Sequence, residues 1–535
     1  MFHDARNLPA GTVLEAEICI VGAGAAGISL AHSLRDAAGR SGGFRVLLLE
    51  SGDMELEEPT QALYQGELRG EAQLDLDASR LRYFGGTTNH WAGWCRKLEA
   101  HDFQPPDPAD PRRWPFGREE LDPWYAAAHT ALGLGPDDDA LEPWLAAAGA
   151  TALPLDPKRL RTALFQVHPV RLGAEHEAAF ATSRTIDVWL NANVLEVQTD
   201  ATASRVTGLR ARSLAGGEFT VSAKLFVLAA GGLETTRLLL LSNRVQPAGL
   251  GNTHDLVGRT FMDHPWLAHF GFVAFSRGDH DLRLYLDEVE ARGVRVLATL
   301  APGMAEPGIG GFRVLLRPSR RIVEGVAALK SIGGDIAALR WPRQFFGNLG
   351  RAFYDYDAVI DSTYKTLFRT RKGPFGAPEP QDAPIVGAHL DINVEQMPNP
   401  DSRVTLTRAR DALGQNRLAL DWRPGVPEKR TIRRAVELVG LEMGRLGIGR
   451  LRGNILGDTD AWPGDLQGSR HHMGTTRMAE SPRMGVVDAQ CRVHGVANLY
   501  IASSSVFPGA GFANPTLTIV ALALRLGAQL QKELT

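Results

Sequence analysis

The sequence has little cysteine and no long apolar run. Only Cys19, Cys95 and Cys491 are present in 535 residues, too few and too scattered for a disulfide framework or a cysteine metal cluster. The longest apolar run near the C-terminus, LTIVALALRL, is interrupted by Arg525 and is well short of a bilayer span. These absences argue against a secreted disulfide scaffold and against a transmembrane segment, and they favour a reducing compartment.

The chain also lacks a charge imbalance and an export signal. It has 58 basic and 61 acidic residues and a formal net charge of -3, so nothing global indicates a nucleic-acid partner. The N-terminus, MFHDARNLPAGTVLEAE, has no basic segment followed by an apolar one. We therefore expect a cytoplasmic protein, periplasmic only if it is exported with a partner, that binds no nucleic acid.

A nucleotide-binding pattern occupies the N-terminal region. A buried strand over 18–21 is followed by Gly22-Ala-Gly24-Ala-Ala-Gly27 and an amphipathic helix. The glycines allow a tight turn, close approach of the backbone to a pyrophosphate and close packing of helix on strand. Glu50 ends the next strand, 23 residues past Gly27, where a carboxylate accepts hydrogen bonds from ribose hydroxyls. A glycine turn without ligand is the competing interpretation, and the pattern alone does not separate NAD from FAD.

The length of the chain predicts two or more domains, or one large domain with insertions. Similar α/β patterns recur in the middle and at the end of the sequence, which indicates one discontinuous nucleotide-binding domain over 1–100, 185–262 and 463–535. A substrate-binding domain is expected over 101–184 and 263–462. The runs that alternate between apolar and polar residues are typical of an antiparallel sheet with one face covered, and they lie at 389–395, 403–407 and 418–422.

Residues 317–372 form a stretch that is both basic and aromatic, with eleven arginines and lysines against five acids. Such a helical insertion fits a lid, a subunit interface through which the chain oligomerises, or a membrane-surface patch. A helical excursion that packs its aromatic side chains on the domain is the simpler interpretation, and we favour it.

The C-terminal seventy residues carry the most specific motifs in the chain. The sequence resembles the glucose-methanol-choline (GMC) oxidoreductases, flavoproteins that oxidise alcohols, and in texture it is most similar to pyranose 2-oxidase and the bacterial FAD-dependent sugar dehydrogenases. The motifs that carry the resemblance are His471-His-Met-Gly474-Thr475, Val486-Val-Asp488, Asn498-Leu-Tyr500, Asn514-Pro-Thr516, GGTTNHW, LAAGGLETTRLLLLS, VGRTFMDHP and EQMPNPDSRV. They span nearly the whole chain. The resemblance implies an α/β fold like that of p-hydroxybenzoate hydroxylase, in which a Rossmann-like FAD-binding domain joins a substrate domain whose antiparallel sheet is covered by helices.

The resemblance also implies a mechanism in which a histidine takes the proton of a sugar, glycoside or cyclitol hydroxyl while the carbon gives hydride to flavin N5. Its motif spacing selects His471 as this base, and a neutral imidazole with pKa near ~6.5 suits the role. Asn514 supplies an amide beside it, although an N-cap role is the competing interpretation. Because neighbours in an extended segment point to opposite faces, we expect His472 to pack rather than to reach the flavin. His264 is interpreted as structural.

FAD is the cofactor that the resemblance implies, and no metal is expected. The residues expected to contact FAD are Gly22, Gly24, Ala25, Gly27, Glu50, Gly86, Thr87, Asn89, His90, Val194, Ala230, Ser503, Asn514 and Thr516. His90 matches the histidine that pyranose 2-oxidase bonds to its flavin, so it is a candidate covalent link. Ala92 stands where that family member has a threonine, which puts the hydrogen bond of that threonine to flavin N5 in doubt. Ser503 replaces the aspartate of many members, as it does in the bacterial sugar dehydrogenases.

Residues 160–190 contain no cysteine, unlike the branch of the family that carries an iron–sulfur cluster, so we expect no cluster and an oxygen or quinone-type electron acceptor. Three alternatives stay open at this point. The first is a lyase on the same scaffold, in which FAD is structural. The second is an oxidase of an aryl or aliphatic alcohol. The third is an NAD-linked reductase, against which the C-terminal motifs argue.

Overall fold

A parallel sheet with an antiparallel extension forms one half of the molecule. The computed structural model describes residues 1–38, 44–71, 75–105, 107–276, 280–320, 324–337, 341, 345–354, 359–360, 363, 385–453, 456 and 461–534. Within these residues, eight strands pair in the order β1-β7-β3-β2-β10-β9-β8, with β20 also on β10. They are β1 (Phe2–Asp4), β2 (Val13–Val21), β3 (Val46–Leu49), β7 (Ile186–Leu190), β8 (Asn193–Thr199), β9 (Val206–Arg212), β10 (Glu218–Leu228) and β20 (Leu499–Ile501).

The pairing explains why three distant stretches of the sequence have similar α/β patterns. β7, β3, β2, β10 and β20 pair in parallel, so strands from the N-terminal, middle and C-terminal stretches lie side by side. Over 18–21, 46–49 and 225–228 the side chains are buried on both faces of the sheet, which is why these segments are continuous apolar runs. β8, β9 and β10 are antiparallel neighbours. The predicted α/β fold class is confirmed.

A larger antiparallel sheet forms the other half. Among the described residues its order is β18-β11-β15-β14-β13-β6-β5, with β12 on β13 and β19 on β11. These strands are β5 (Trp94–Cys95), β6 (Leu160–Val167), β11 (Pro265–Phe275), β12 (Val289–Ala291), β13 (Val294–Pro302), β14 (Phe312–Arg320), β15 (Ile385–Val394), β18 (Gly449–Gly453) and β19 (Leu466–Gly468). Since β5 comes from the stretch 1–100 but pairs with β6, the division of the chain into domains stays a proposal.

A small third sheet changes one detail of the expected pattern. β16 (Arg403–Arg410) and β17 (Asn416–Trp422) are antiparallel, as their alternation predicts, but they pair with β4 (Glu67–Gly70) and not with β15. The parallel pairing of β17 with β4 joins a late segment of the chain to an early one. Sequence periodicity predicts the strands here but not which sheet they enter.

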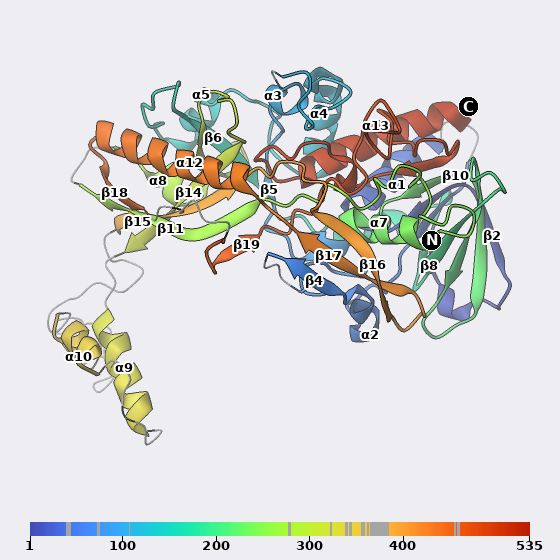
Figure 1. The fold of residues 1–535 in the computed structure, drawn as a ribbon, viewed down its shortest axis with the longest axis horizontal. Helices are drawn as coiled ribbons and strands as arrows, with labels where there is room; N and C mark the ends of the chain where they lie inside the picture. Colours follow the sequence, from blue (N-terminus) through green and yellow to red (C-terminus); the bar gives the residue numbers. More distant parts are fainter. Residues whose placement is uncertain are drawn as a thin grey trace.

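Helices cover the outer faces of both large sheets (Figure 1). α1 packs on α13, and α12 lies across the antiparallel sheet. The described helices are α1 (Ala25–Ala38), α2 (Glu58–Gln61), α3 (Ala100–Phe103), α4 (Asp122–Ala131), α5 (Glu142–Ala148), α6 (Leu172–Ala181), α7 (Gly231–Leu241), α8 (Arg283–Leu286), α9 (Glu324–Ala337), α10 (Phe345–Tyr354), α12 (Val426–Arg445) and α13 (Thr516–Leu534). Within the described ranges, no helix combines the length and the apolar character that a membrane crossing needs.

The basic, aromatic stretch 317–372 begins on β14 and continues into α9 and α10, which pack on each other and stand away from the body of the molecule (Figure 1). Trp341 is 82% exposed. The interpretation that the aromatic side chains of this stretch pack on the domain is wrong for Trp341, whose ring lies 5.9 Å from that of Phe345 on α10, away from the body of the molecule. The aromatic residues at 356, 364 and 368 lie outside the described residues, and oligomerisation through this stretch stays a prediction.

Candidate active site

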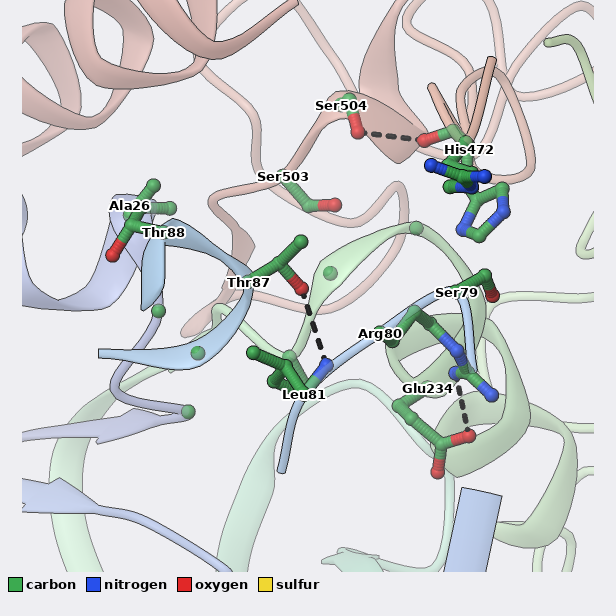
Figure 2. A pocket seen from close by; sticks show the side chains of 18 of the residues that line it. Ala26, Ser79, Arg80, Leu81, Thr87, Thr88, Glu234, His472, Ser503 and Ser504 are labelled. Atoms are coloured by element: carbon green, nitrogen blue, oxygen red, sulfur yellow. Dashed lines mark hydrogen bonds and ion pairs between the residues drawn. The ribbon is translucent and has the colours of Figure 1, made fainter. Parts of the chain in front are cut away.

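One cavity of about 710 Å³ connects the two large sheets. It is lined by the turn after β2, by the start of α7, by β14 and β15, and by the segments before and after β20. Figure 2 shows part of it: Arg80 and Glu234 are joined on one wall, Ser504 donates to the backbone of His472 on another, and Thr87 and Ser503 lie to the left of Arg80 and His472 in this view. The elements that the sequence motifs mark, although far apart in the chain, therefore surround a single space.

The turn after β2 has the geometry that its glycines were expected to allow. Gly22 has φ of 106°, and a Cβ there would lie 2.7 Å from the carbonyl oxygen of Ala229. A Cβ on Gly27 would lie 1.9 Å from the carbonyl oxygen of Gly22. Beside Gly24, by contrast, there is no protein atom within 4 Å of such a Cβ among the described residues. Gly22 and Gly27 thus allow close packing of the backbone around the turn, and Gly24 leaves open space at the N-terminus of α1.

Glu50 is held at the end of β3, next to this turn. Its carboxylate is buried and accepts hydrogen bonds from the backbone N–H groups of Ala23 and Gly52, each at 2.9 Å. These bonds fix the carboxylate beside the glycine turn and leave lone pairs for a ligand, since a carboxylate has about four acceptor positions. An open space at a helix N-terminus beside a fixed carboxylate fits the diphosphate and ribose of a dinucleotide.

A buried charge cluster lines the cavity near α7. Glu234 accepts from Arg80 at 3.0 Å and from Arg82 at 3.3 Å, and Arg237 pairs with Asp411 at 2.6 Å and with Glu234 at 3.3 Å. Burial raises the pKa of Glu234, but the three guanidinium groups lower it by more, so the pKa is about 2. Each of these buried arginines therefore has a carboxylate partner.

At the other end of the cavity three side chains form a hydrogen-bonded row. Nδ1 of His471 lies 2.8 Å from Nδ1 of His264, and Nε2 of His264 lies 2.9 Å from the carbonyl oxygen of Gly511. On its other side, Nε2 of His471 lies 3.4 Å from Nδ2 of Asn514. The predicted base and amide are therefore neighbours, and His264, interpreted as structural, contacts the base directly.

The row determines where the protons are. A carbonyl oxygen only accepts, so Nε2 of His264 carries a hydrogen and its Nδ1 accepts from Nδ1–H of His471. Nε2 of His471 is then unprotonated and receives Nδ2–H of Asn514. Burial, followed by the charges around it, keeps the pKa of His471 well below its usual value, and burial lowers that of His264 to about 3. Both rings are neutral at neutral pH, with one basic nitrogen beside the amide.

Asp263 positions the backbone of this row. Its buried carboxylate accepts from the backbone N–H of His264 at 2.7 Å, of His471 at 2.9 Å and of Arg470 at 3.0 Å. Arg470 has φ of 65°, so the segment is not a regular strand. Both His471 and His472 belong to the cavity lining, and the expectation that only His471 reaches the flavin stays a prediction. His472 packs near Phe261 and, within the described part of the chain, makes no hydrogen bond with Asn514.

Arg313 is a site residue that sequence reasoning missed. It lies on β14, is only 6% exposed, lines the cavity and donates through Nη1 to Oδ1 of Asn514. The signal was a single cation inside the apolar run GFRVLL, since a charged residue in a buried strand needs a partner or a function. The basic, aromatic stretch identified in the sequence begins only at Arg317, four residues later.

Most of the expected cofactor residues do line the cavity. Those that line it are Gly22, Gly24, Ala25, Glu50, Gly86, Thr87, His90, Val194, Ala230, Ser503, Asn514 and Thr516. Gly27 instead packs under the turn, and the amide of Asn89 donates to the carbonyl oxygen of Phe84 at 2.9 Å. His90 follows the short helix Gly86–Asn89, and burial together with Arg470 and Arg171 lowers its pKa.

Comparison with known proteins gives two family matches. Residues 17–250 match the family described as FAD dependent oxidoreductase, and residues 398–523 match the family described as GMC oxidoreductase. The two matches include the glycine turn at one end of the cavity and the histidine–asparagine pair at the other.

Full-length relatives and a solved structure agree with these matches. The fructose dehydrogenase large subunit of Gluconobacter japonicus is 23% identical over 96% of this chain and 97% of its own length. Paromamine 6'-oxidase of Streptomyces fradiae is 25% identical over 95% of this chain and 90% of its own. The crystal structure of pyridoxine 4-oxidase from Mesorbium loti superposes with a TM-score of 0.56 at 18% identity, covering 96% of this chain and 98% of that one.

Proposed function

Because the chain belongs to the glucose-methanol-choline oxidoreductases, flavin-dependent enzymes that act on CH–OH groups, we propose that it oxidises a hydroxyl of a sugar, glycoside or cyclitol to the carbonyl. The observation that carries the proposal is the row from His264 through His471 to Asn514, which opens on the same cavity as the glycine turn. A proton acceptor and a cofactor-sized space thus meet in one place.

His471 is the general base of this proposal. Its neutral imidazole presents an unprotonated Nε2 beside Nδ2–H of Asn514, so a substrate hydroxyl can donate to Nε2 while its oxygen accepts from the amide. Holding the oxygen in this way aims the carbinol C–H bond in a fixed direction. His264 holds the ring by its Nδ1–H, which keeps the basic nitrogen facing the cavity.

The residues around Gly24 and Glu50 fit FAD. A cradle that a Cβ would fill, a helix N-terminus and a fixed carboxylate are the parts that a flavin dinucleotide needs for its diphosphate and ribose. When bound, FAD supplies the acceptor for the hydride of the carbinol carbon. Thr87, Ser503 and Thr516 line the same cavity as Glu50 and His471, and we propose that they contact the flavin.

We further propose that His90 contacts FAD, since its ring lines the cavity and its pKa is lowered. A neutral imidazole is the form that can bond to a flavin carbon, so the covalent link stays a prediction that one experiment decides. Acid precipitation of the purified protein leaves yellow flavin in the pellet if the bond exists. Flavin found entirely in the supernatant excludes the bond and leaves the contact intact.

A sugar-like substrate is supported by the walls near His471. Trp94 and Trp266 line the cavity there together with the polar side chains of Asn393 and Ser469. Flat apolar surfaces beside hydrogen-bonding groups suit a ring that has C–H faces and hydroxyl edges. The full-length relatives named for fructose and paromamine support the same class. Electrons then leave the flavin for oxygen or a quinone-type acceptor.

Anaerobic reduction of the bound flavin tests the proposal. A panel of sugars, glycosides, cyclitols and aryl alcohols is added to the holoenzyme, and bleaching of the flavin absorption band is followed. We expect at least one polyol to bleach it, and reoxidation with oxygen or a quinone then identifies the acceptor. Bleaching by aryl alcohols alone favours the non-sugar oxidase. A flavin that no alcohol reduces favours the lyase and overturns the proposal, and a colourless protein overturns the FAD assignment as well.

A further inference from the structure

The face of the antiparallel sheet that borders the cavity carries an unusual arginine. β14 and β15 pair with Arg313 opposite Asn393 and Arg317 opposite His389, and Arg313, Arg317 and Asn393 all line the cavity. Arg317 is half exposed and pairs with Asp391 at 2.8 Å. Arg313 precedes Arg317 by four residues on the same face of β14 and is only 6% exposed. Its surroundings differ from those of Arg317.

Every polar or aromatic partner of Arg313 is neutral. Its guanidinium donates to Oδ1 of Asn514 and, at 3.4 Å, to Oδ1 of Asn393, and it lies 5.4 Å from the ring centre of Trp94 and 5.1 Å from that of Phe165. In the described part of the chain, no carboxylate lies within 4.0 Å of its nitrogens. The cation is therefore held in a cage of amides and rings without a counter-ion.

Other arginines of the cavity wall are balanced. Arg80 and Arg82 pair with Glu234, and Arg237 pairs with Asp411. Arg470 lies at the surface, where water solvates its charge. An ion that is buried without an opposite charge costs free energy, and this cost is recovered only when an anion arrives. Although burial and Arg317 lower its pKa to about 10, Arg313 is still charged at neutral pH.

Arg313 also has donors to spare. A guanidinium has five N–H groups in a planar fork, and the acceptors named above occupy its Nε and one Nη1 hydrogen. Nη2 has no acceptor among the described residues. Paired parallel hydrogen bonds from such a fork match a carboxylate in shape as well as in charge.

We propose that Arg313 binds a carboxylate of the substrate, so that the preferred substrates are acidic polyols such as uronic or aldonic acids. The inference rests on the proposed function and narrows its substrate class. Asn514 relates the two groups in space, because its Nδ2 faces His471 and its Oδ1 faces Arg313. A hydroxyl at the base and a carboxylate at the guanidinium are then separated by about the width of one carboxamide, as they are within a single sugar acid.

Matched pairs of acidic and neutral sugars test the inference. The FAD holoenzyme is mixed anaerobically with glucuronate or glucose, and with galacturonate or galactose, at equal ionic strength, and the half-saturating concentration for flavin reduction is measured. We expect the acid to half-saturate at a concentration at least tenfold lower than that of its neutral partner. In Arg313→Gln the half-saturating concentration of the acid should rise roughly tenfold to a hundredfold more than that of its neutral partner, as expected for the loss of charge-assisted hydrogen bonds.

Two further variants serve as controls for the role of Arg313. Arg313→Lys keeps a charge without the fork and should retain part of the preference, and it replaces Arg313→Gln if the latter does not fold. Arg161→Gln, on β6 of the same sheet, removes a guanidinium that pairs with Glu99 outside the cavity lining, and it should leave the preference unchanged. A wild-type enzyme that prefers the neutral sugars overturns the inference. So does an equal loss for both members of a pair, which instead assigns Arg313 to charge on the cofactor.

Thermal unfolding separates this inference from the proposed function. Sodium glucuronate should raise the Tm of the wild-type holoenzyme more than glucose does at equal ionic strength, because a ligand that binds the folded state stabilises it. Arg313→Gln should abolish the difference. If no alcohol reduces the flavin, the proposed function fails while this binding result still stands or falls separately. Equal Tm shifts for glucuronate and glucose in the wild type contradict a carboxylate site.

Discussion

The two ends of the cavity treat buried positive charge in opposite ways. Near α7, Arg80, Arg82 and Arg237 are matched by carboxylates at 2.6–3.3 Å. Near His471, Arg313 is more buried than Arg80 and slightly less buried than Arg237, but it contacts only amides and aromatic rings. The first arrangement is complete within the protein, and the second is incomplete until another group supplies negative charge.

The difference separates structural charge from functional charge. A balanced cluster contributes to the folded state at every stage of the reaction, whereas an unbalanced cation costs stability in the free enzyme and is compensated only by what binds. The same cation also lies one amide away from His471, the proposed general base, so it acts on the proton affinity of this histidine. Variants of the charge cluster near α7 and of Arg313 near His471 test this difference between balanced and unbalanced charge.

The largest effect is expected at the base itself. His471→Gln removes the nitrogen that accepts the hydroxyl proton but keeps a side chain of similar reach, so anaerobic flavin reduction should slow by roughly 10²–10⁴-fold. Binding of the alcohol should change far less than the rate. Stopped-flow absorbance at saturating substrate measures this loss. His176→Gln, a histidine outside the cavity lining, is the control, and a rate in His471→Gln within threefold of wild type would rule out the assigned base.

Next in size is the charge cluster. Glu234→Gln leaves Arg80, Arg82 and Arg237 with Asp411 as their one remaining carboxylate among the described partners, and breaking a buried pair in this way costs about 3–5 kcal/mol. Arg313→Gln removes a cation that has no carboxylate, so its free energy of unfolding should stay within about 1 kcal/mol of wild type or increase. Urea unfolding of both holoenzyme variants measures these free energies of unfolding. Equal losses in the two variants would contradict the distinction between balanced and unbalanced buried charge.

The glycine turn was predictable from the sequence because its constraints are local. Gly22 and Gly27 meet backbone atoms within a few ångströms, and such backbone requirements appear in the sequence as fixed residues at fixed spacing. His471 and Asn514 were predicted instead from the resemblance of their motifs to those of the family, and both residues line the same cavity. Local sequence pattern was therefore sufficient to predict residues whose role depends on backbone geometry, such as Gly22 and Gly27.

The wall facing the base was not predictable, because it depends on strand register. Arg313 reaches Asn514 only because β14 pairs with β15 in one register and places that face toward the segment after β20. A one-residue shift would move the guanidinium to the other side of the sheet. The contact of His264 with His471, 207 positions away in sequence, was missed for the same reason. The helices α9 and α10 could be predicted as helices, but not their departure from the body.

A smaller effect is expected at Gly24. A Cβ there meets no described protein atom within 4 Å, so Gly24→Ala should fold with a Tm close to wild type, yet the methyl group enters the space assigned to the diphosphate. We expect FAD to be lost at least about tenfold more readily on dialysis, because the backbone can no longer approach the phosphates closely. Flavin content per protein and the Tm of the apoprotein measure the two effects. Gly27→Ala should instead destabilise the apoprotein, since its Cβ would lie 1.9 Å from the carbonyl oxygen of Gly22.

The smallest effect concerns pH and connects the two properties of Arg313. Burial, His264 and Arg313 all lower the pKa of His471, so the base stays neutral well below pH 6.5, and kcat/KM for a neutral sugar should be flat from pH 8 through 6.5 and decline only at more acidic pH. Removing the positive charge in Arg313→Gln makes the imidazolium easier to form, which raises the pKa of His471 and moves the acidic limb upward. A neutral sugar is required, because an acidic one would lose its own binding contact in the variant. Arg161→Gln should leave the limb in place, and a limb that moves downward in Arg313→Gln would mean that the cation does not act on the base.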